Sequence, residues 1–166
     1  IRGCENTKIP SSVTLIGDYA FTGCRGLTSI EIPSGVWSIG DLAFVDCSGL
    51  ASIVVSPENP YYSSEGNCNA IIETETNTLI RGCKNTKIPS SVTDIAEFAF
   101  LGCSGLTSIE IPSSVTRIGQ SAFSECSGLT SIVVSPENPY YSSEGNCNAI
   151  ISNNVGSVGN DDRLLI

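Results

Sequence analysis

Short repeats within the sequence constrain its fold more than any other feature. The motif Ile-Pro-Ser-x-Val recurs at a spacing of 23 residues within each half of the chain. Its four copies begin at Ile9, Ile32, Ile88 and Ile111. In each half a third unit follows that is lengthened to about 33 residues, which gives six units in all. Because self-similarity at such periods is typical of solenoids, we expect six stacked coils, each burying apolar side chains against its neighbours.

Each unit contains one strand followed by a return path. Ile30 and Ile32 alternate with Ser29 and Glu31, so the isoleucines should face the core while the polar pair faces outward. Pro33 then ends strand pairing because proline lacks a backbone N–H. The following Ala-Phe-x-x-Cys segment fits a single helical or 3₁₀ turn. One coil of a solenoid results.

A longer repeat encloses the short one. Residues 52–72 return unchanged as residues 131–151, so the longer period is 79 residues. We expect one solenoid over residues 1–166, made of two units, 1–79 and 80–158, and a C-terminal tail. The chain contains no Met and begins within a repeat. We therefore expect it to be a segment of a longer protein, with any targeting or anchoring signal outside it.

The short units resemble one known family, the BspA-type leucine-rich repeat. Its hallmark is the pattern Ile-Pro-x-x-Val-x-x-Ile-Gly-x-x-Ala-Phe-x-x-Cys-x-x-Leu, which the following segments match: 9–27, 32–50, 88–106 and 111–129. The resemblance implies a β-rich α/β leucine-rich repeat solenoid of about six stacked 23-residue coils, with parallel strands on the concave face. It also implies a bacterial protein that is secreted or exposed at the cell surface, since several members are adhesins for host matrix proteins or other bacteria.

Composition excludes several other classes of protein. Eight Lys and Arg against 17 Asp and Glu give a net charge of −9, which repels nucleic acids and anionic lipid surfaces. No apolar run approaches the roughly 18 residues of a spanning helix, so we expect no direct membrane insertion. The absence of His removes Ser-His and Cys-His catalysis and His-ligated metals. The only close acidic pairs, Asp161 with Asp162 and Glu73 with Glu75, fall in expected turns without a pocket, so we expect no enzyme and no cofactor.

Four of the eight cysteines occupy a core position of the repeat. They follow an Ala-Phe pair after two intervening residues and should behave as small buried hydrophobic groups: Cys24, Cys47, Cys103 and Cys126. The sequence contains no Cys-x-x-Cys cluster, so we expect no metal site at these cysteines.

The other cysteines belong to a hairpin expected in each lengthened coil. Residues 69–72 and 78–81 flank a polar turn, and an even loop places Cys68 directly opposite Cys83. Cross-strand partners can form a disulfide, and a reduced buried pair is the alternative. Cys4 and Cys147 should then pair with neighbouring units of a longer parent, unless the C-terminal tail substitutes. In the second unit the hairpin would return through a longer turn to residues 163–166.

A ligand surface is expected on the outward side of the strands. The candidate residues there are Ser29, Glu31, Ser52, Val54, Ser108 and Glu110. Lys8 and Lys87 lie in the same column beside Glu31 and Glu110, so ion pairs along the ladder are the alternative interpretation of these charges. Small hydroxyl residues beside them would make a flat, polar surface suited to a protein partner.

Aromatic residues supply further candidates for contact. The Tyr61-Tyr62 pair and its copy Tyr140-Tyr141 follow prolines, and in an extended segment one tyrosine of each pair should point outward, at Tyr61 and Tyr140. Trp37 replaces the Thr found at its position in the other short units, and it is either a contact residue or a packing residue.

The sequence therefore favours a non-enzymatic surface or secreted protein that binds a macromolecule, in the first place a protein of the host matrix or cell surface. Two alternatives stay open: a structural spacer that presents another domain, and a glycan-binding module. Exposed sheet edges at both ends also predict self-association through the solenoid ends.

Overall fold

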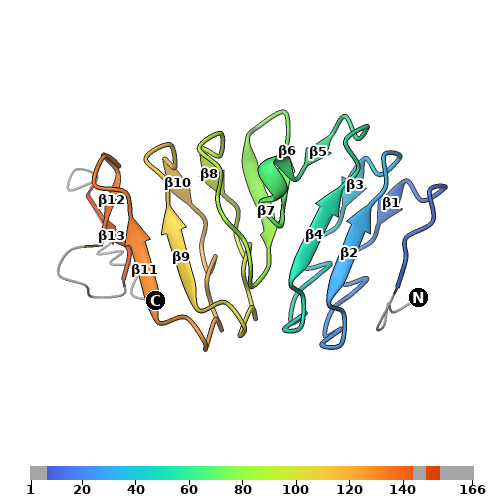
Figure 1. The fold of residues 1–166 in the computed structure, drawn as a ribbon, viewed down its shortest axis with the longest axis horizontal. Coiled ribbons are helices and arrows are strands. Elements are labelled where there is room, and N and C mark those ends of the chain that lie inside the picture. The colour runs from blue at the N-terminus through green and yellow to red at the C-terminus, as the bar shows by residue number, and fades with distance from the viewer. Residues whose placement is uncertain (1–6, 144–148, 154–166) are drawn as a thin grey trace.

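Successive coils stack along one axis, as the 23-residue spacing predicts (Figure 1). The computed structural model describes residues 7–143 and 149–153. Four coils carry a four-residue strand at the same place: β2 (Ser29–Ile32), β4 (Ser52–Val55), β9 (Ser108–Ile111) and β11 (Ser131–Val134). Pairing is parallel and in register, with Glu31 opposite Val54 and Glu110 opposite Val133. We call the outward surface of these four strands the strand face.

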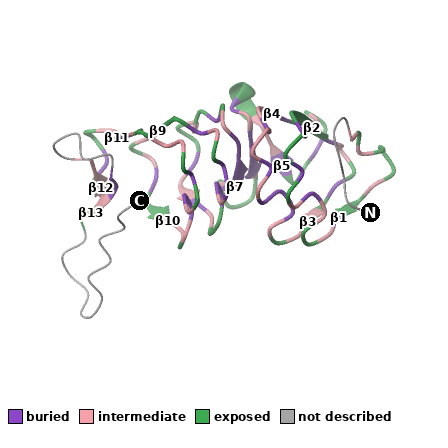
Figure 2. Ribbon diagram, turned by 90° about the horizontal axis from the view of Figure 1, so that it is seen from below, coloured by how far each residue is buried: buried purple, intermediate pink, exposed green. Residues whose placement is uncertain are grey.

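A second row of short strands lies on another side of the solenoid (Figure 2). It contains the two-residue strands β1 (Leu15–Ile16), β3 (Ser38–Ile39), β8 (Asp94–Ile95) and β10 (Arg117–Ile118). The insert of the first unit adds β5 (Tyr62–Ser63), β6 (Ala70–Glu73) and β7 (Thr78–Gly82). In the second unit β12 (Tyr141–Ser142) pairs with β13 (Ile151–Ser152) as β5 pairs with β6.

The strand face is interrupted at two positions of the outward column expected from the sequence, those of Lys8 and Lys87. β2 pairs with β4, and β9 pairs with β11, but no strand forms at Lys8 or Lys87. The insert follows β4 immediately, and its Ser64 hydroxyl accepts a hydrogen bond from the Val55 amide at 2.8 Å. A side chain of the insert thus accepts a hydrogen bond from a backbone N–H at the edge of β4, which would otherwise need an acceptor in the next coil.

The return path is a run of turns, not the helical or 3₁₀ turn expected from Ala-Phe-x-x-Cys. Leu42 and Asp46 have φ of 53° and 57°, and a right-handed helix cannot contain such left-handed residues. The equivalent positions of the other short coils also have positive φ: Tyr19, Gly23, Phe98, Gly102, Ser121 and Glu125. Within the described residues the 3₁₀ helix η1 (Glu65–Asn67) lies in the insert instead.

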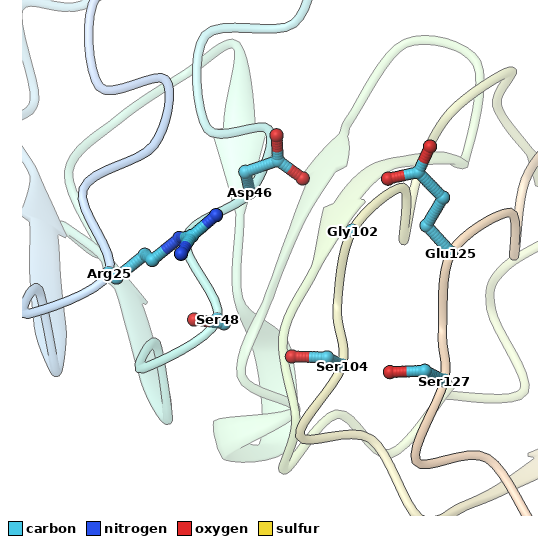
Figure 3. Close-up of a pocket in the computed structure, with 7 residues that line it drawn as sticks. All are labelled: Arg25, Asp46, Ser48, Gly102, Ser104, Glu125 and Ser127. Atoms are coloured by element: carbon cyan, nitrogen blue, oxygen red, sulfur yellow. The ribbon is translucent and has the colours of Figure 1, made fainter.

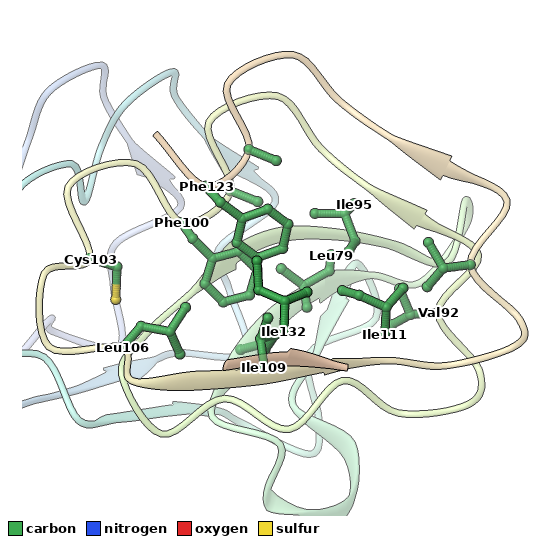
Figure 4. Packing of buried hydrophobic residues seen from close by; sticks show 14 of the residues in the cluster. Leu79, Val92, Ile95, Phe100, Cys103, Leu106, Ile109, Ile111, Phe123 and Ile132 are labelled. Atoms are coloured by element: carbon green, nitrogen blue, oxygen red, sulfur yellow. The ribbon is translucent and has the colours of Figure 1, made fainter. Parts of the chain in front are cut away.

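The hairpin of β6 and β7 forms a wall between two core clusters. Ile71 packs into the first cluster, which contains the stacked rings of Phe21 and Phe44. Ala70 and Ile72, on either side of it in sequence, pack into the second cluster. Alternation along one strand therefore contributes to both cores. In the second cluster Phe100 and Phe123 stack at a centroid distance of 4.9 Å (Figure 4).

Arg81 and Gly82 attach this hairpin to the following coil. Gly82 N donates to Ala99 O, and the Arg81 guanidinium donates from Nη1 to Phe98 O and from Nη2 to Leu101 O, each at 3.2 Å. In the regular coils a backbone amide makes the corresponding hydrogen bond to the next coil, as Phe100 N does when it donates to Ala122 O. Arg81 is 7% exposed, and burial lowers its pKa.

Cys68 does not lie directly opposite Cys83, so that part of the sequence prediction is wrong. A register shift between Ile71 and Ile72 adds one residue to β7 and aligns Ala70 with Gly82. Cys68 consequently packs in the second core cluster and Cys83 in the first. Both are free, buried thiols in the structure, and no disulfide joins them. Cys4, Cys147 and the expected return strand at 163–166 lie outside the described residues.

The repeat-position cysteines should be inert while the protein is folded. Burial is the main cause that raises the pKa of Cys47 to about 11, of Cys103 to about 12 and of Cys126 to about 11. We expect iodoacetamide to label these thiols at pH 8 only after urea is added, as measured by peptide mass spectrometry with glutathione as the reactive control. Rapid labelling without urea would contradict their burial.

The same shifts predict a loss of stability in alkaline solution. The folded-state pKa values lie above the unfolded value of 9.0, so the contribution is fully present below pH 9 and is lost as pH rises toward 11 to 12. The urea concentration at which half of the protein is unfolded should therefore decrease as the pH is raised above 9.

Candidate functional site

A hollow of about 580 Å³ lies on the strand face of the first unit. Its lining comes from the first coil, from β2 and β4, and from the turns that follow these strands. It includes Ser29, Glu31, Ser52 and Val54, four of the residues predicted from the outward strand column. The other lining residues are Thr7, Lys8, Ile9, Ser11, Ile30, Pro33, Ser34 and Ser56. We call this hollow the strand-face groove.

Strand alternation explains why these side chains meet. In β2, Ser29 and Glu31 are exposed while Ile30 and Ile32 are buried. Because β4 pairs with β2 in register, Ser52 lies beside Ser29 and Val54 lies beside Glu31. The groove therefore presents several hydroxyl groups, apolar surface that includes Val54, which is 46% exposed, and charges of both signs.

The charges of the groove are not used in a ladder of ion pairs. Among the residues that the structure describes, one ion pair lies within 4.0 Å, and it joins Arg117 to Asp94 at 2.7 Å on the second row of strands. Glu31 with Lys8, and Glu110 with Lys87, form none. The ladder interpretation is thus wrong for these pairs, because the two lysines lie outside any strand and are not held opposite the glutamates.

In the second unit Ser108 and Glu110 of β9 are exposed in the same arrangement as Ser29 and Glu31. Val133 of β11, opposite Glu110, is 50% exposed and repeats Val54. The outward Glu and Val positions predicted from the sequence therefore occur side by side in both units.

The predicted aromatic candidates lie elsewhere. Tyr61 and Tyr140 point outward as expected, while Tyr62 is buried and Tyr141 partly buried. The hydroxyl of Tyr141 accepts a hydrogen bond from Ile118 N at 3.0 Å, at the end of β10. Burial raises the pKa of both inner tyrosines.

Trp37 directly precedes β3, in the second row of strands. Its backbone amide donates to Thr14 O at 3.0 Å, and 55% of the residue is exposed. The structure therefore does not bring Trp37 into the strand-face groove.

Sequence reasoning missed Asn59, which positions the outer tyrosine. Its Nδ2 donates to Pro33 O and Val36 O of the preceding coil, at 2.8 and 2.9 Å. Its Oδ1 accepts from the amides of Tyr61 and Tyr62, both at 2.9 Å. The signal was the Asn shared by the two Pro-Glu-Asn-Pro segments, since Asn138 makes the same four contacts.

A second polar pocket of about 520 Å³ lies beside the turns that carry the core cysteines (Figure 3). Its lining consists of Arg25, Asp46, Ser48, Gly102, Ser104, Glu125 and Ser127. Ser48, Ser104 and Ser127 follow equivalent cysteines, so the repeat itself aligns their hydroxyls. Figure 3 shows the carboxylates of Asp46 and Glu125 on either side of Gly102. This pocket offers hydrogen bonds but no apolar wall.

The described part of the chain holds neither a cluster of metal-ligating side chains nor a long apolar helix. No group of three His, Cys, Asp or Glu side chains there could hold a metal ion. None of the helices in residues 7–143 and 149–153 is long and apolar enough to cross a membrane.

Comparison with known proteins agrees with the repeat pattern. The sequence model of the family described as BspA type leucine rich repeat region matches six copies, over residues 2–79 and 69–159. A leucine rich cell surface protein from Faecalibacterium prausnitzii is similar at 37% identity and a TM-score of 0.60, over 74% of this chain and 33% of that one. The present chain thus spans a third of that protein.

Two further solved structures share the fold at lower identity. A leucine-rich repeat protein from Eubacterium ventriosum has 23% identity and a TM-score of 0.58, over 79% of this chain and 42% of its own. The pneumococcal vaccine antigen PcpA has 20% identity and a TM-score of 0.57, over 72% of this chain and 30% of its own. A search of curated proteins found no match.

Proposed function

This chain belongs to the BspA-type leucine-rich repeat family, and from that premise we propose that it is a non-enzymatic surface or secreted protein that binds a protein partner through the strand-face groove. The partner we propose is a protein of the host extracellular matrix or cell surface. The similarity to a leucine rich cell surface protein supports the proposed location.

The observation that carries this proposal is the unpaired charge on the strand face, both in the groove and at the equivalent position of the second unit. An exposed carboxylate that stabilised the ladder would be expected to have a cation within 4 Å, yet among the described residues neither Glu31 of the groove nor Glu110 of β9 has one. Exposed valines and serines surround these carboxylates. Such a surface combines apolar contact, hydrogen-bonding groups and a charge that can select a partner. An array of coils extends the surface over more than one unit.

Reversing the charge of the two strand-face glutamates should strongly weaken partner binding. We expect the full chain to bind immobilised fibronectin, fibrinogen or intact host cells saturably. The double variant Glu31→Lys/Glu110→Lys should bind at least about tenfold more weakly, because each new lysine repels the basic groups of the partner that the glutamate attracts. Surface plasmon resonance and cell attachment assays measure both.

The matched control is Glu58→Lys/Glu137→Lys, which makes the same change of charge at two exposed, repeat-equivalent positions that do not line the groove. Equal weakening by both variants would indicate an effect of net charge alone and would contradict a site on the strand face. Absence of binding by the unmodified chain to every surface would instead favour the role of a structural spacer.

A further inference from the structure

A third hollow, of about 440 Å³, lies where the hairpin of the first unit meets the next coil. Its apolar walls include Tyr19, Leu42 and Phe98, which come from the turns after β1, β3 and β8. Glu73 and Arg81 of the hairpin also line it. We call this hollow the junction cleft. It is separate from the strand-face groove and shares none of its lining residues.

The apolar walls of the junction cleft are costly for the fold. Tyr19, Leu42 and Phe98 occupy one repeat position, and their φ values are 57°, 53° and 59°. A bulky side chain in the left-handed region is a genuine outlier that costs of the order of 1 to 3 kcal/mol. Burial does not offset this cost fully, because Tyr19 is 56% and Phe98 36% exposed.

The fold does not require large side chains at this position. The last short coil has Ser121 there, with φ of 55°. The other left-handed position of each coil carries residues that tolerate the conformation better in three of four cases: Gly23, Asp46 and Gly102. Exposed rings at a strained position are therefore explained better by contact with a ligand than by stability.

The charge of the junction cleft favours a cation. Asp41, Glu73 and Glu97 line it together with one cationic side chain, Arg81, so three carboxylates against one guanidinium leave a formal charge of −2. The guanidinium is already directed at two backbone carbonyls, those of Phe98 and Leu101. Aromatic rings beside carboxylates form a suitable site for a Lys or Arg side chain, whose alkyl stem packs on a ring while its charged end meets the acids.

We propose that the junction cleft binds an extended basic segment of a partner protein, with a Lys or Arg side chain held between the exposed rings of Tyr19 and Phe98 and the carboxylates of Asp41 and Glu97. Because Tyr19, Leu42 and Phe98 belong to three coils, the segment runs along the solenoid axis and alternates basic with apolar residues. This site is independent of the proposed function of the strand face.

The repeat provides a substitution that tests the site without disturbing the fold. Gln120 and Ser121 stand at the positions of Glu97 and Phe98 in the next short coil, so Glu97→Gln/Phe98→Ser gives one coil the residues of its neighbour. The probe is a fluorescein-labelled peptide of four Lys-Leu pairs, and binding to the full chain is measured by fluorescence anisotropy at 150 mM salt. We expect saturable binding that is at least about tenfold weaker in this variant, with the urea midpoint retained.

Three controls make the outcome decisive. A peptide of four Glu-Leu pairs should not bind. Asp41→Asn removes one carboxylate, leaves both aromatic side chains in place, and should weaken binding of the Lys-Leu peptide. Glu31→Gln/Glu110→Gln on the strand face should leave Lys-Leu binding unchanged. The proposal is overturned if the unmodified chain does not bind the basic peptide, if the Glu97→Gln/Phe98→Ser variant binds it equally well, or if only the strand-face variant weakens it.

Discussion

Replacing Gly82 with Ala should destabilise the protein by about 3 kcal/mol or more, because no space exists for a methyl group at this point of β7. A Cβ built on Gly82 would overlap Cε1 of Phe100 and approach Cζ and Cδ1 of the same ring to 2.5 and 2.8 Å. The ring cannot move aside easily, since it is fully buried and stacks on Phe123. The backbone is also held, because Gly82 N donates to Ala99 O at 2.9 Å.

Urea unfolding followed by the fluorescence of Trp37 or by circular dichroism would measure this effect. The control is Gly17→Ala, whose nearest neighbour would be Leu15 Cδ2 at 4.0 Å and whose φ is not positive; we expect a change within about 0.5 kcal/mol. Combining Gly82→Ala with Phe100→Leu should cost less than the sum of the single changes, because the two share one space. An unchanged urea midpoint for Gly82→Ala would show that β7 does not pack on Phe100 as described.

The stacked coils were predictable from the sequence because the 23-residue period acts on every coil alike. Alternation in Ser29–Ile32 sufficed to assign the buried and the outward side chains. The interruption between β4 and β9 was not predictable in this way, since it depends on how a single insert fits between coils. One extra residue in β7, at the register shift between Ile71 and Ile72, moved Cys83 away from Cys68.

The candidate site likewise contains features that the local sequence predicts and features that it does not. Ser29, Glu31, Ser52 and Val54 were expected to meet because local alternation and the repeat register place them together. The ion pair between Glu31 and Lys8 was not formed, because it required a strand at Lys8 that the first described coil lacks.

The junction cleft could not be predicted from local pattern at all. Tyr19 and Phe98 are 79 positions apart in the sequence, and the cleft they share is also lined by Glu73 and Arg81 of the hairpin. The exposure of a large side chain at a left-handed position, which identifies these residues, is visible only once φ is known.

Removing the side chain of Asn59 should destabilise the first unit by about 3 to 5 kcal/mol, which is large for a single polar group. An amide side chain has two N–H donors and two acceptor lone pairs, and Asn59 uses all four, with 7% of the residue exposed. In Asn59→Ala the carbonyl of Val36 and the amide of Tyr62 lose these partners in a buried place, and each unpaired group costs roughly 1 to 3 kcal/mol. The insert would also lose its tie to the preceding coil, because both donated bonds end on that coil.

Asn59→Asp distinguishes the two hydrogen bonds that the side chain accepts from the two that it donates. The carboxylate can still accept from the amides of Tyr61 and Tyr62, but it has no proton for Pro33 O and Val36 O and places a negative charge 2.8 to 2.9 Å from both. We therefore expect Asn59→Asp to be at least as destabilising as Asn59→Ala at pH 7, and to recover part of the loss when acidification protonates the carboxyl group.

Urea midpoints at pH 7 and pH 4 would test both substitutions, with Asn85→Ala as the control, since Asn85 is exposed and its side chain makes none of these contacts. Asn138→Ala removes the same four hydrogen bonds from the second unit. Because Asn59 and Asn138 bind different coils, their costs should add within about 0.5 kcal/mol. If Asn59→Ala unfolds at the same urea concentration as the unmodified chain, the insert is held by its apolar contacts alone, and the four hydrogen bonds contribute specificity rather than stability.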